Sequence, residues 1–139
     1  MPGRASASWL PPVCTEEHPP YEGRYHFPEG RTVTYVHDPP ASGPHWPVWL
    51  RWERYTTPMR REYWVHNLEH GAIVLLYHPD APADVVAGLN AAWDAIPNDL
   101  PCDHKRAVMT PDPLLDQDFA VVAQGTVLNC DRPDVARIL

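Results

Sequence analysis

The alternation of apolar and polar positions along the chain predicts one helix, at residues 82–96. Pro82 suits the first helical turn, Asp84 complements the positive end of the helix dipole, and Pro97 ends the segment. The apolar residues between them recur mostly at intervals of three and four, which gives the helix a single apolar stripe: Val85, Leu89, Ala92, Trp93 and Ile96. We expect this stripe to pack against the rest of the domain.

Shorter runs predict β-strands. Residues 72–77 form a continuous apolar run, which is typical of a fully buried strand. Runs rich in β-branched and aromatic residues predict further strands at 31–36, 63–65, 106–109 and 119–123, the last continuing through 126–128. Together these elements indicate an α+β fold, with a small, largely antiparallel sheet, one packed helix and long Pro-rich loops.

The distribution of proline suggests how the chain is organised. The 139 residues include 18 prolines, about two to three times average usage. Residues 1–30 hold several of them and show no sustained period of 2 or 3.6, so we expect an extended N-terminal arm whose aromatic residues favour wrapping around the core. Residues 31–139 then form a single histidine-rich α+β domain.

Composition excludes two classes of partner. The net charge is −7, and Lys105 is the single lysine, whereas a nucleic-acid-binding surface needs clustered Lys and Arg. No apolar run approaches the roughly 18 residues that a membrane span requires. The more informative feature is the presence of eight histidines.

The three cysteines are Cys14, Cys102 and Cys130, and none belongs to a C-x-x-C pair. We favour a disulfide between Cys102 and Cys130, because both lie in polar, loop-like contexts that flank two predicted strands. The alternative is that all three are reduced in a cytoplasmic protein.

His66 and His70 are four residues apart. On a helical turn both imidazoles project from the same face and can bind one metal ion, whereas in a strand they would lie about 13 Å apart. The metal hypothesis therefore requires residues 66–71 to be helical or turned. The alternative is that both are ordinary polar loop residues bonded to nearby carbonyl groups.

The same run, His66-Asn67-Leu68-Glu69-His70, fits the H-x-x-E-H pattern of the inverzincin zinc peptidases, in which the Glu is the general base. Those enzymes place the pattern within a long helix, but here a glycine and a β-rich run follow immediately. Glu69 is thus a candidate metal ligand, general base, or acceptor that orients a ligating imidazole. We favour the last role, or capping of the first turn.

His45 lies between Pro44 and Trp46 in a loop stiffened by several prolines. Such a loop restricts the backbone and directs the imidazole, so His45 is a candidate third ligand. The alternative is a turn that Trp46 packs against the core while the imidazole is only solvated.

Two motifs resemble a known family. The run Pro-Pro-Ala-Ser-Gly-Pro-His at residues 39–45 is followed about twenty residues later by Val-His-Asn-Leu-Glu-His-Gly at residues 65–71. Both resemble the bacterial family of domain of unknown function 3105, over residues from about 24 to 125. The resemblance implies a histidine-rich site, with His26 as an additional ligand, in proteins that are usually exported or membrane-anchored. Because residues 1–8 lack the apolar core of a signal peptide, a cytoplasmic location stays open.

Histidine ligands suit copper or zinc, and the Irving–Williams order favours copper. The first hypothesis is therefore a copper-binding protein with ligands His26, His45, His66 and His70, to which the thioether of Met109 is a candidate addition. The second is a metal-dependent enzyme, either a copper oxidoreductase or a zinc hydrolase with Glu69 as base. The third is a metal-free binding module with an aromatic cleft, suggested by six tryptophans.

Overall fold

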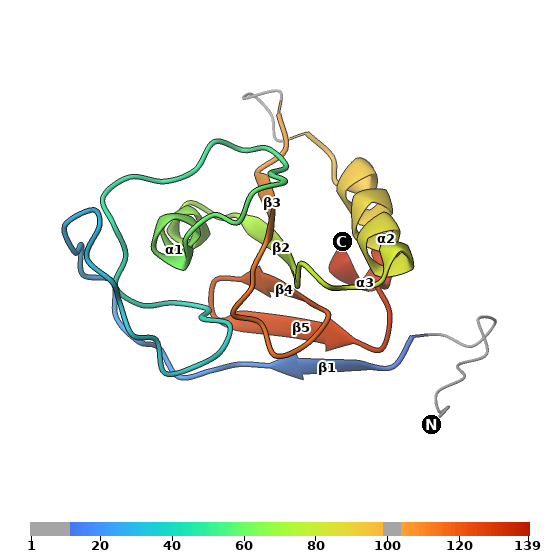
Figure 1. Cartoon of the computed structure of the whole chain (residues 1–139), viewed down its shortest axis with the longest axis horizontal. Coiled ribbons are helices and arrows are strands. Elements are labelled where there is room, and N and C mark those ends of the chain that lie inside the picture. The colour runs from blue at the N-terminus through green and yellow to red at the C-terminus, as the bar shows by residue number, and fades with distance from the viewer. Residues whose placement is uncertain (1–11, 99–103) are drawn as a thin grey trace.

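The computed structural model describes residues 12–98 and 104–139. Within these residues the chain forms five strands and three helices, and Figure 1 shows α1 and α2 on opposite sides of the sheet. In chain order the elements are β1 (Cys14–Glu17), α1 (Arg61–Glu69), β2 (Ile73–Tyr77), α2 (Ala83–Ala95), β3 (Ala107–Pro111), β4 (Phe119–Ala123), β5 (Thr126–Cys130) and α3 (Val135–Ile138).

The fold is α+β and its sheet is mixed, in the strand order β1-β5-β4-β2-β3. Strand β2 pairs with β3 in parallel, whereas the other three pairs are antiparallel. The expectation of a largely antiparallel sheet is therefore wrong. The reason is that α2 connects β2 to β3, and a crossover helix returns the chain so that both strands run in the same direction.

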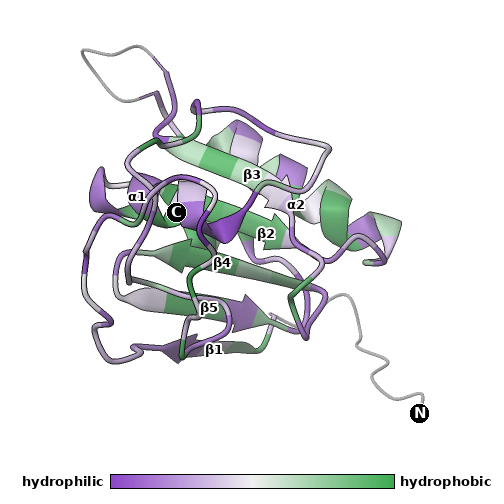
Figure 2. Cartoon of the chain, turned by 60° about the vertical axis from the view of Figure 1, so that its left-hand side comes forward, coloured by the Kyte–Doolittle hydropathy of each residue, from purple (hydrophilic) through white to green (hydrophobic). Residues whose placement is uncertain are grey.

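The central strands separate two apolar cores. Side chains alternate along β2, so Val74 and Leu76 contribute to the core beneath α1 while Leu75 contributes to the core beneath α2. Figure 2 shows the hydrophobic residues concentrated in the inner strands and the hydrophilic ones in the surrounding loops. The side chain of each residue in these strands therefore faces either α1 or α2, and the position of the residue along the strand decides which.

Helix α2 and strands β2, β4 and β5 confirm the elements predicted at residues 82–96, 72–77, 119–123 and 126–128, and β3 covers most of the strand predicted at 106–109. The strand predicted at 31–36 is wrong. The N–H of Val33 donates to Oε2 of Glu62 at 3.0 Å, and the N–H of Val36 donates to Oε1 of Glu22 at 2.8 Å. Because side chains satisfy these donors, the segment follows a loop rather than joining the sheet.

The strand predicted at 63–65 is also wrong, since these residues lie within α1. Trp64, Val65 and Leu68 are each at most 1% exposed. Their spacing places them on one helical face, which packs against the sheet. The expectation of a single helix is likewise corrected, because α1 and α3 accompany α2.

The N-terminal segment supplies an edge strand that the sequence pattern did not reveal. Strand β1 pairs with β5 so that Cys14 lies opposite Cys130, and a disulfide joins the two. The expected bridge between Cys102 and Cys130 is therefore wrong, and Cys102 lies outside the described residues. A pairing over 116 residues depends on sheet topology, which local composition does not encode.

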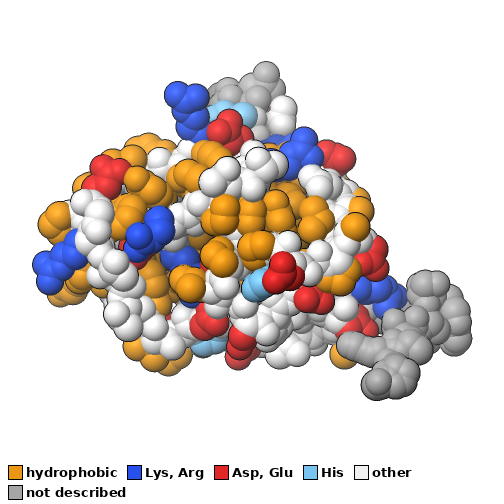
Figure 3. Space-filling view, in the orientation of Figure 1, with side chains coloured by type: hydrophobic (Ala, Val, Ile, Leu, Met, Phe, Trp, Pro, Cys, Tyr) orange, Lys and Arg blue, Asp and Glu red, His pale blue; other side chains and the backbone are white. Residues whose placement is uncertain are grey.

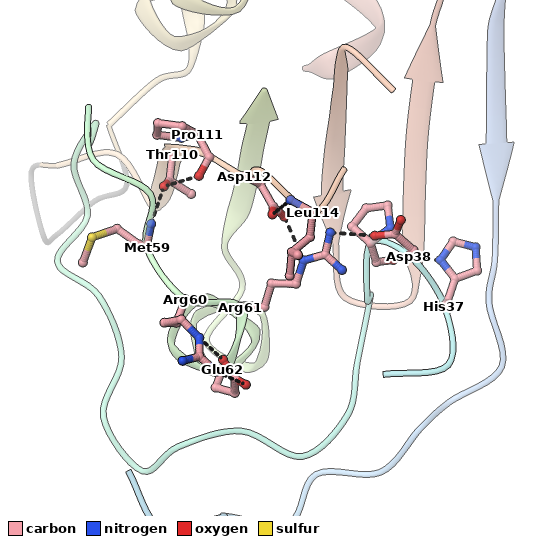
Figure 4. A network of polar contacts seen from close by, with 11 residues as sticks. His37, Asp38, Met59, Arg60, Arg61, Glu62, Thr110, Pro111, Asp112 and Leu114 are labelled. Carbon is pink, nitrogen blue, oxygen red and sulfur yellow. Dashed lines mark hydrogen bonds and ion pairs between the residues drawn. The ribbon is translucent and has the colours of Figure 1, made fainter. Parts of the chain in front are cut away.

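Arg61 anchors the first turn of α1. Its Nε donates to Oδ2 of Asp112 at 2.8 Å, and its Nη2 lies 2.6 Å from Oδ1 of Asp38 (Figure 4). Asp112 follows β3, and Asp38 precedes the Pro-Pro segment that leads to His45. One buried guanidinium therefore connects the helix to the sheet and to the loop with the first histidine motif.

Across the part of the chain that the structure describes, no helix combines the length and the apolar character needed to cross a membrane. On the face shown in Figure 3, hydrophobic side chains gather over the middle of the molecule, and Lys and Arg side chains are scattered among acidic ones toward its edges.

Candidate metal centre

Helix α1 carries the second histidine motif. His66 lies in its last turn, and His70 is the C-cap residue, with φ −95° and ψ 16°. Gly71 follows with φ +85°, a conformation that L side chains rarely adopt, and the chain then turns into β2. Residues 66–71 are thus partly helical and partly turned, which is the local structure that the metal hypothesis requires.

The loop carrying His45 is fixed by its backbone. A short parallel bridge joins His45 to His26: the N–H of His45 donates to the carbonyl of Tyr25 at 3.0 Å, and the N–H of Phe27 donates to the carbonyl of His45 at 2.8 Å. The bridge therefore holds His26, which is distant in sequence from both motifs, beside the first of them.

Gly43 allows the loop to approach this closely. Its φ is +129°, and a Cβ there would lie 2.8 Å from the ring of Tyr35. The hydroxyl of Tyr35 donates to the carbonyl of Pro44, immediately before His45. Burial raises the pKa of Tyr35 well above its ordinary value, so this hydroxyl keeps its proton and remains a donor.

Three imidazoles meet where the bridge faces α1. One nitrogen from each of His26, His45 and His66 lies within 4.8 Å of the other two. The ring centroids are 5.1 Å apart for His26 and His45, 5.3 Å for His26 and His66, and 4.7 Å for His45 and His66. His45 and His66 are buried and His26 is exposed, so the cluster opens to solvent on the His26 side.

Hydrogen bonds to the backbone direct the two buried rings. Nδ1 of His45 lies 2.8 Å from the carbonyl of Gly43, and Nδ1 of His66 lies 2.7 Å from the carbonyl of Trp46. Because a carbonyl only accepts, each Nδ1 carries the proton and each Nε2 of the neutral ring presents a lone pair. This is the arrangement in which a histidine binds a metal through one nitrogen while a carbonyl fixes the other.

Nε2 of His45 is buried and has no hydrogen-bond partner among the described residues. Oε1 of Glu69 lies 3.1 Å away, without hydrogen-bond alignment. A buried polar atom without a hydrogen-bond partner costs free energy, and a ligand to this nitrogen would offset that cost. A metal ion at the centre of the three rings would bind this nitrogen, and the residues present therefore fit such an ion.

Glu69 faces the lone-pair nitrogen of His45 rather than its protonated nitrogen. The carbonyl of Gly43 already fixes the tautomer of that ring, so the favoured orienting role of Glu69 is not needed at His45. Its carboxylate is placed instead where a metal ligand or a base beside a bound metal would lie. The side chain is 26% exposed, which leaves it accessible to solvent.

Burial lowers the pKa of His66 below its ordinary value, since an imidazolium there would lose its hydration. The hydrogen bond to the carbonyl of Trp46 opposes this shift, and the neighbouring histidines add to it. The ring therefore stays neutral to lower pH than a solvated histidine, which is the form that binds metal.

The other two predicted ligands lie elsewhere. The ring of His70 stacks on that of His66 with centroids 5.1 Å apart, but its nitrogens do not belong to the group of three. Met109 is buried in the core beneath α2, on the opposite face of the sheet from α1. The register of β3 directs this thioether away from the histidines.

Trp49 is a neighbour that the sequence argument missed. Its ring centroid lies 5.0 Å from that of His66 and 4.6 Å from that of His70, and the residue is 48% exposed. The sequence offered no signal beyond the local abundance of tryptophan, because the contact joins a loop to a helix. Trp49 therefore packs beside His66 and His70.

A pocket adjoins the open side of the cluster and is lined by Arg24, Tyr25, His26 and Glu69. It shares His26 and Glu69 with the site, so a molecule could reach the cluster from this side. The site thus combines two buried imidazole nitrogens, one exposed imidazole nitrogen and a carboxylate that is accessible to solvent.

Searches of curated proteins and of solved structures found no significant match. A family comparison does match, over residues 26–139, with the family described as "Protein of unknown function (DUF3105)". The matched region contains His26, His45, His66 and Glu69, and it covers most of the chain. The protein is therefore a member of the DUF3105 family.

Proposed function

We propose that the protein binds one divalent transition-metal ion through the imidazoles of His26, His45 and His66. The observation that carries this proposal is the buried Nε2 of His45, which lacks a hydrogen-bond partner among the described residues while Nδ1 of the same ring is held by a carbonyl. A cluster maintained only by hydrogen bonds would pair that nitrogen with a donor. A metal ion satisfies it without a donor.

The donor set favours a divalent ion over copper(I). Soft sulfur ligands select copper(I), but Met109 faces the other core, and the described cysteines, Cys14 and Cys130, form a disulfide. Imidazole nitrogens suit copper(II) and zinc(II) alike. The Irving–Williams order places copper(II) first at equal geometry, and zinc(II) is the alternative.

Glu69 supports a second candidate function. Its carboxylate oxygen is 3.1 Å from the metal-facing nitrogen of His45, and it lines the adjoining pocket. Three protein ligands with one open position, together with a carboxylate base, form the arrangement of hydrolytic zinc sites. If Glu69 ligates the ion instead, the set closes at four and favours storage or transport.

The test of binding is a titration of the full chain, purified without a histidine tag and treated with a chelator. Copper(II) and zinc(II) are added separately in competition with a chromophoric chelator, and elemental analysis gives the stoichiometry. We expect one ion per chain, with affinity lowered at least tenfold by His66→Ala, which is about 1.4 kcal/mol. Equal affinity of parent and variant for both metals would refute the proposal.

Glu69→Gln distinguishes the two candidate functions. If the carboxylate is a ligand, the substitution lowers metal affinity by roughly ten- to a hundredfold. If it is a base, the variant keeps its metal but loses hydrolysis of a 4-nitrophenyl ester by the zinc-loaded protein. Asp80→Asn is the matched control, because Asp80 is an exposed carboxylate outside the cluster and the adjoining pocket.

A further inference from the structure

A second pocket lies at the opposite end of α1 from the histidines, beside the polar network of Figure 4. Its volume is about 230 Å³, and it shares no lining residue with the histidine cluster or with the pocket beside it. A cavity that holds one water needs a volume of only about 10–15 Å³, whereas pockets for drug-sized ligands have volumes from about 300 to 1,000 Å³. The space therefore suits a small organic molecule.

Apolar groups form most of the wall. Val33 is buried, Tyr35 and Met59 are partly buried, and Leu114 is 67% exposed beside them. A large exposed leucine next to a hollow of this kind gives a ligand an apolar surface to cover. We therefore expect the body of the ligand to be apolar.

The positive and negative charges of the residues that line the pocket are equal in number. Two arginines, Arg60 and Arg61, and two carboxylates, Glu62 and Asp112, line the pocket. Asp38 also contacts Arg61 but does not line the pocket. An anionic ligand would face these carboxylates and a cationic one the guanidinium groups, so the electrostatics favour a neutral ligand.

The carboxylates are already engaged as acceptors. Glu62 receives two N–H groups from Arg60, at 3.1 Å and 2.9 Å, and the N–H of Val33 at 3.0 Å. Asp112 receives Nε of Arg61 at 2.8 Å and the N–H of Leu114 at 2.9 Å. Glu62 thus accepts three hydrogen bonds and Asp112 two, so more than half of their combined acceptor positions are already occupied.

Arg61 retains donors. A guanidinium has five N–H groups, and the two contacts of Arg61 with Asp112 and Asp38 engage two of them. Its Nη2 is buried, and among the described residues its contact of 2.6 Å with Oδ1 of Asp38 engages at most one of its two N–H groups. Arg61 is itself only 9% exposed. A buried donor without an acceptor costs free energy, which a ligand acceptor would recover.

We propose that this pocket binds a small neutral organic molecule whose carbonyl oxygen accepts from Arg61 and whose apolar body packs against Tyr35, Met59 and Leu114. The site is separate from the histidine cluster and does not depend on metal binding. Acetophenone, a neutral ketone with an aromatic body, is a suitable probe, and ethylbenzene, which replaces the carbonyl by a methylene, is its matched control.

The experiment is a ¹H–¹⁵N NMR titration of the metal-free full chain. We expect acetophenone to produce saturable shifts at the amides of Val33, Met59 and Arg61, and ethylbenzene to bind at least tenfold more weakly because it leaves the guanidinium donor unpaired. Leu114→Arg, which places a bulky charged group at the rim, should weaken acetophenone binding at least tenfold.

Val13→Arg is the control variant, because Val13 is 73% exposed and does not line the pocket. It should leave acetophenone affinity within twofold. The proposal is overturned if acetophenone shows no saturable shifts up to its solubility, if the shifts lie elsewhere on the protein, if both probes bind equally, or if Leu114→Arg has no more effect than Val13→Arg.

Discussion

His26 is the proposed ligand whose removal best separates metal binding from folding. Its side chain is exposed, whereas those of His45 and His66 are buried. The bridge to His45 is made by backbone atoms of Tyr25, Phe27 and His45, so His26→Ala leaves these hydrogen bonds intact. We expect the free energy of unfolding of the metal-free variant to stay within about 0.5 kcal/mol of the parent, as for other exposed substitutions.

Metal affinity should respond quite differently. Loss of one of three nitrogen ligands should raise the Kd at least tenfold, about 1.4 kcal/mol. At a free metal concentration of 100 times the parent Kd, binding stabilises the parent by about 2.7 kcal/mol. The same concentration is then only about ten times the Kd of His26→Ala and stabilises that variant by about 1.4 kcal/mol. Urea denaturation with and without zinc(II) measures this difference.

His70→Ala and His18→Ala are the controls. His70 is also exposed and stacks on His66, but its nitrogens lie outside the group of three, and His18 is an exposed histidine that pairs with Glu16. Both variants should keep the full metal-dependent stabilisation. If His26→Ala behaves like the parent while His70→Ala loses affinity tenfold, the ligand set inferred from the structure is refuted in favour of the pair spaced four residues apart.

Three further predictions concern pH and stability. Burial lowers the pKa of His66, so just below pH 6.5 the unfolded chain binds more protons than the folded chain. The free energy of unfolding of the metal-free protein should therefore fall as pH is lowered through that region. Denaturation at a series of pH values tests this, and His66→Ala should flatten that part of the profile. Thiol titration of the denatured, non-reduced protein should find one free thiol per chain, since Cys14 and Cys130 are bonded; three thiols would contradict the bridge. Reduction of the bridge should lower the free energy of unfolding by roughly 4 to 5 kcal/mol on the chain-entropy model. Arg61→Leu should cost about 3 to 5 kcal/mol of unfolding free energy in urea denaturation because it leaves Asp112 buried without its charge partner, and a loss below about 1 kcal/mol would show that the pair contributes little.

The segments that were predicted correctly are those whose pattern is local. The stripe from Val85 to Ile96 and the apolar run at residues 72–77 specify their own structure, because one buried face or a fully buried strand is encoded in consecutive residues. The failures lie where partners distant in sequence decide. Residues 31–36 have the composition of a strand, but Glu62 and Glu22 satisfy their backbone donors.

In the candidate site, too, some features follow from local sequence and others from partners distant in sequence. By itself the sequence determined that residues 66–71 and 39–45 carry histidines in constrained settings, because the four-residue spacing and the Gly-Pro context restrict where those rings can point. The resemblance to the DUF3105 family was also stated from the sequence, and the family match over residues 26–139 confirms it.

Only the tertiary structure decided which rings meet. The bridge between His26 and His45, the last turn of α1, and the carbonyls of Gly43 and Trp46 together orient three nitrogens toward one point. The same packing leaves His70 at the margin. The physical reason is that a metal site depends on distances of a few ångströms between atoms remote in sequence, and those distances are set by packing and backbone hydrogen bonds that no local pattern contains.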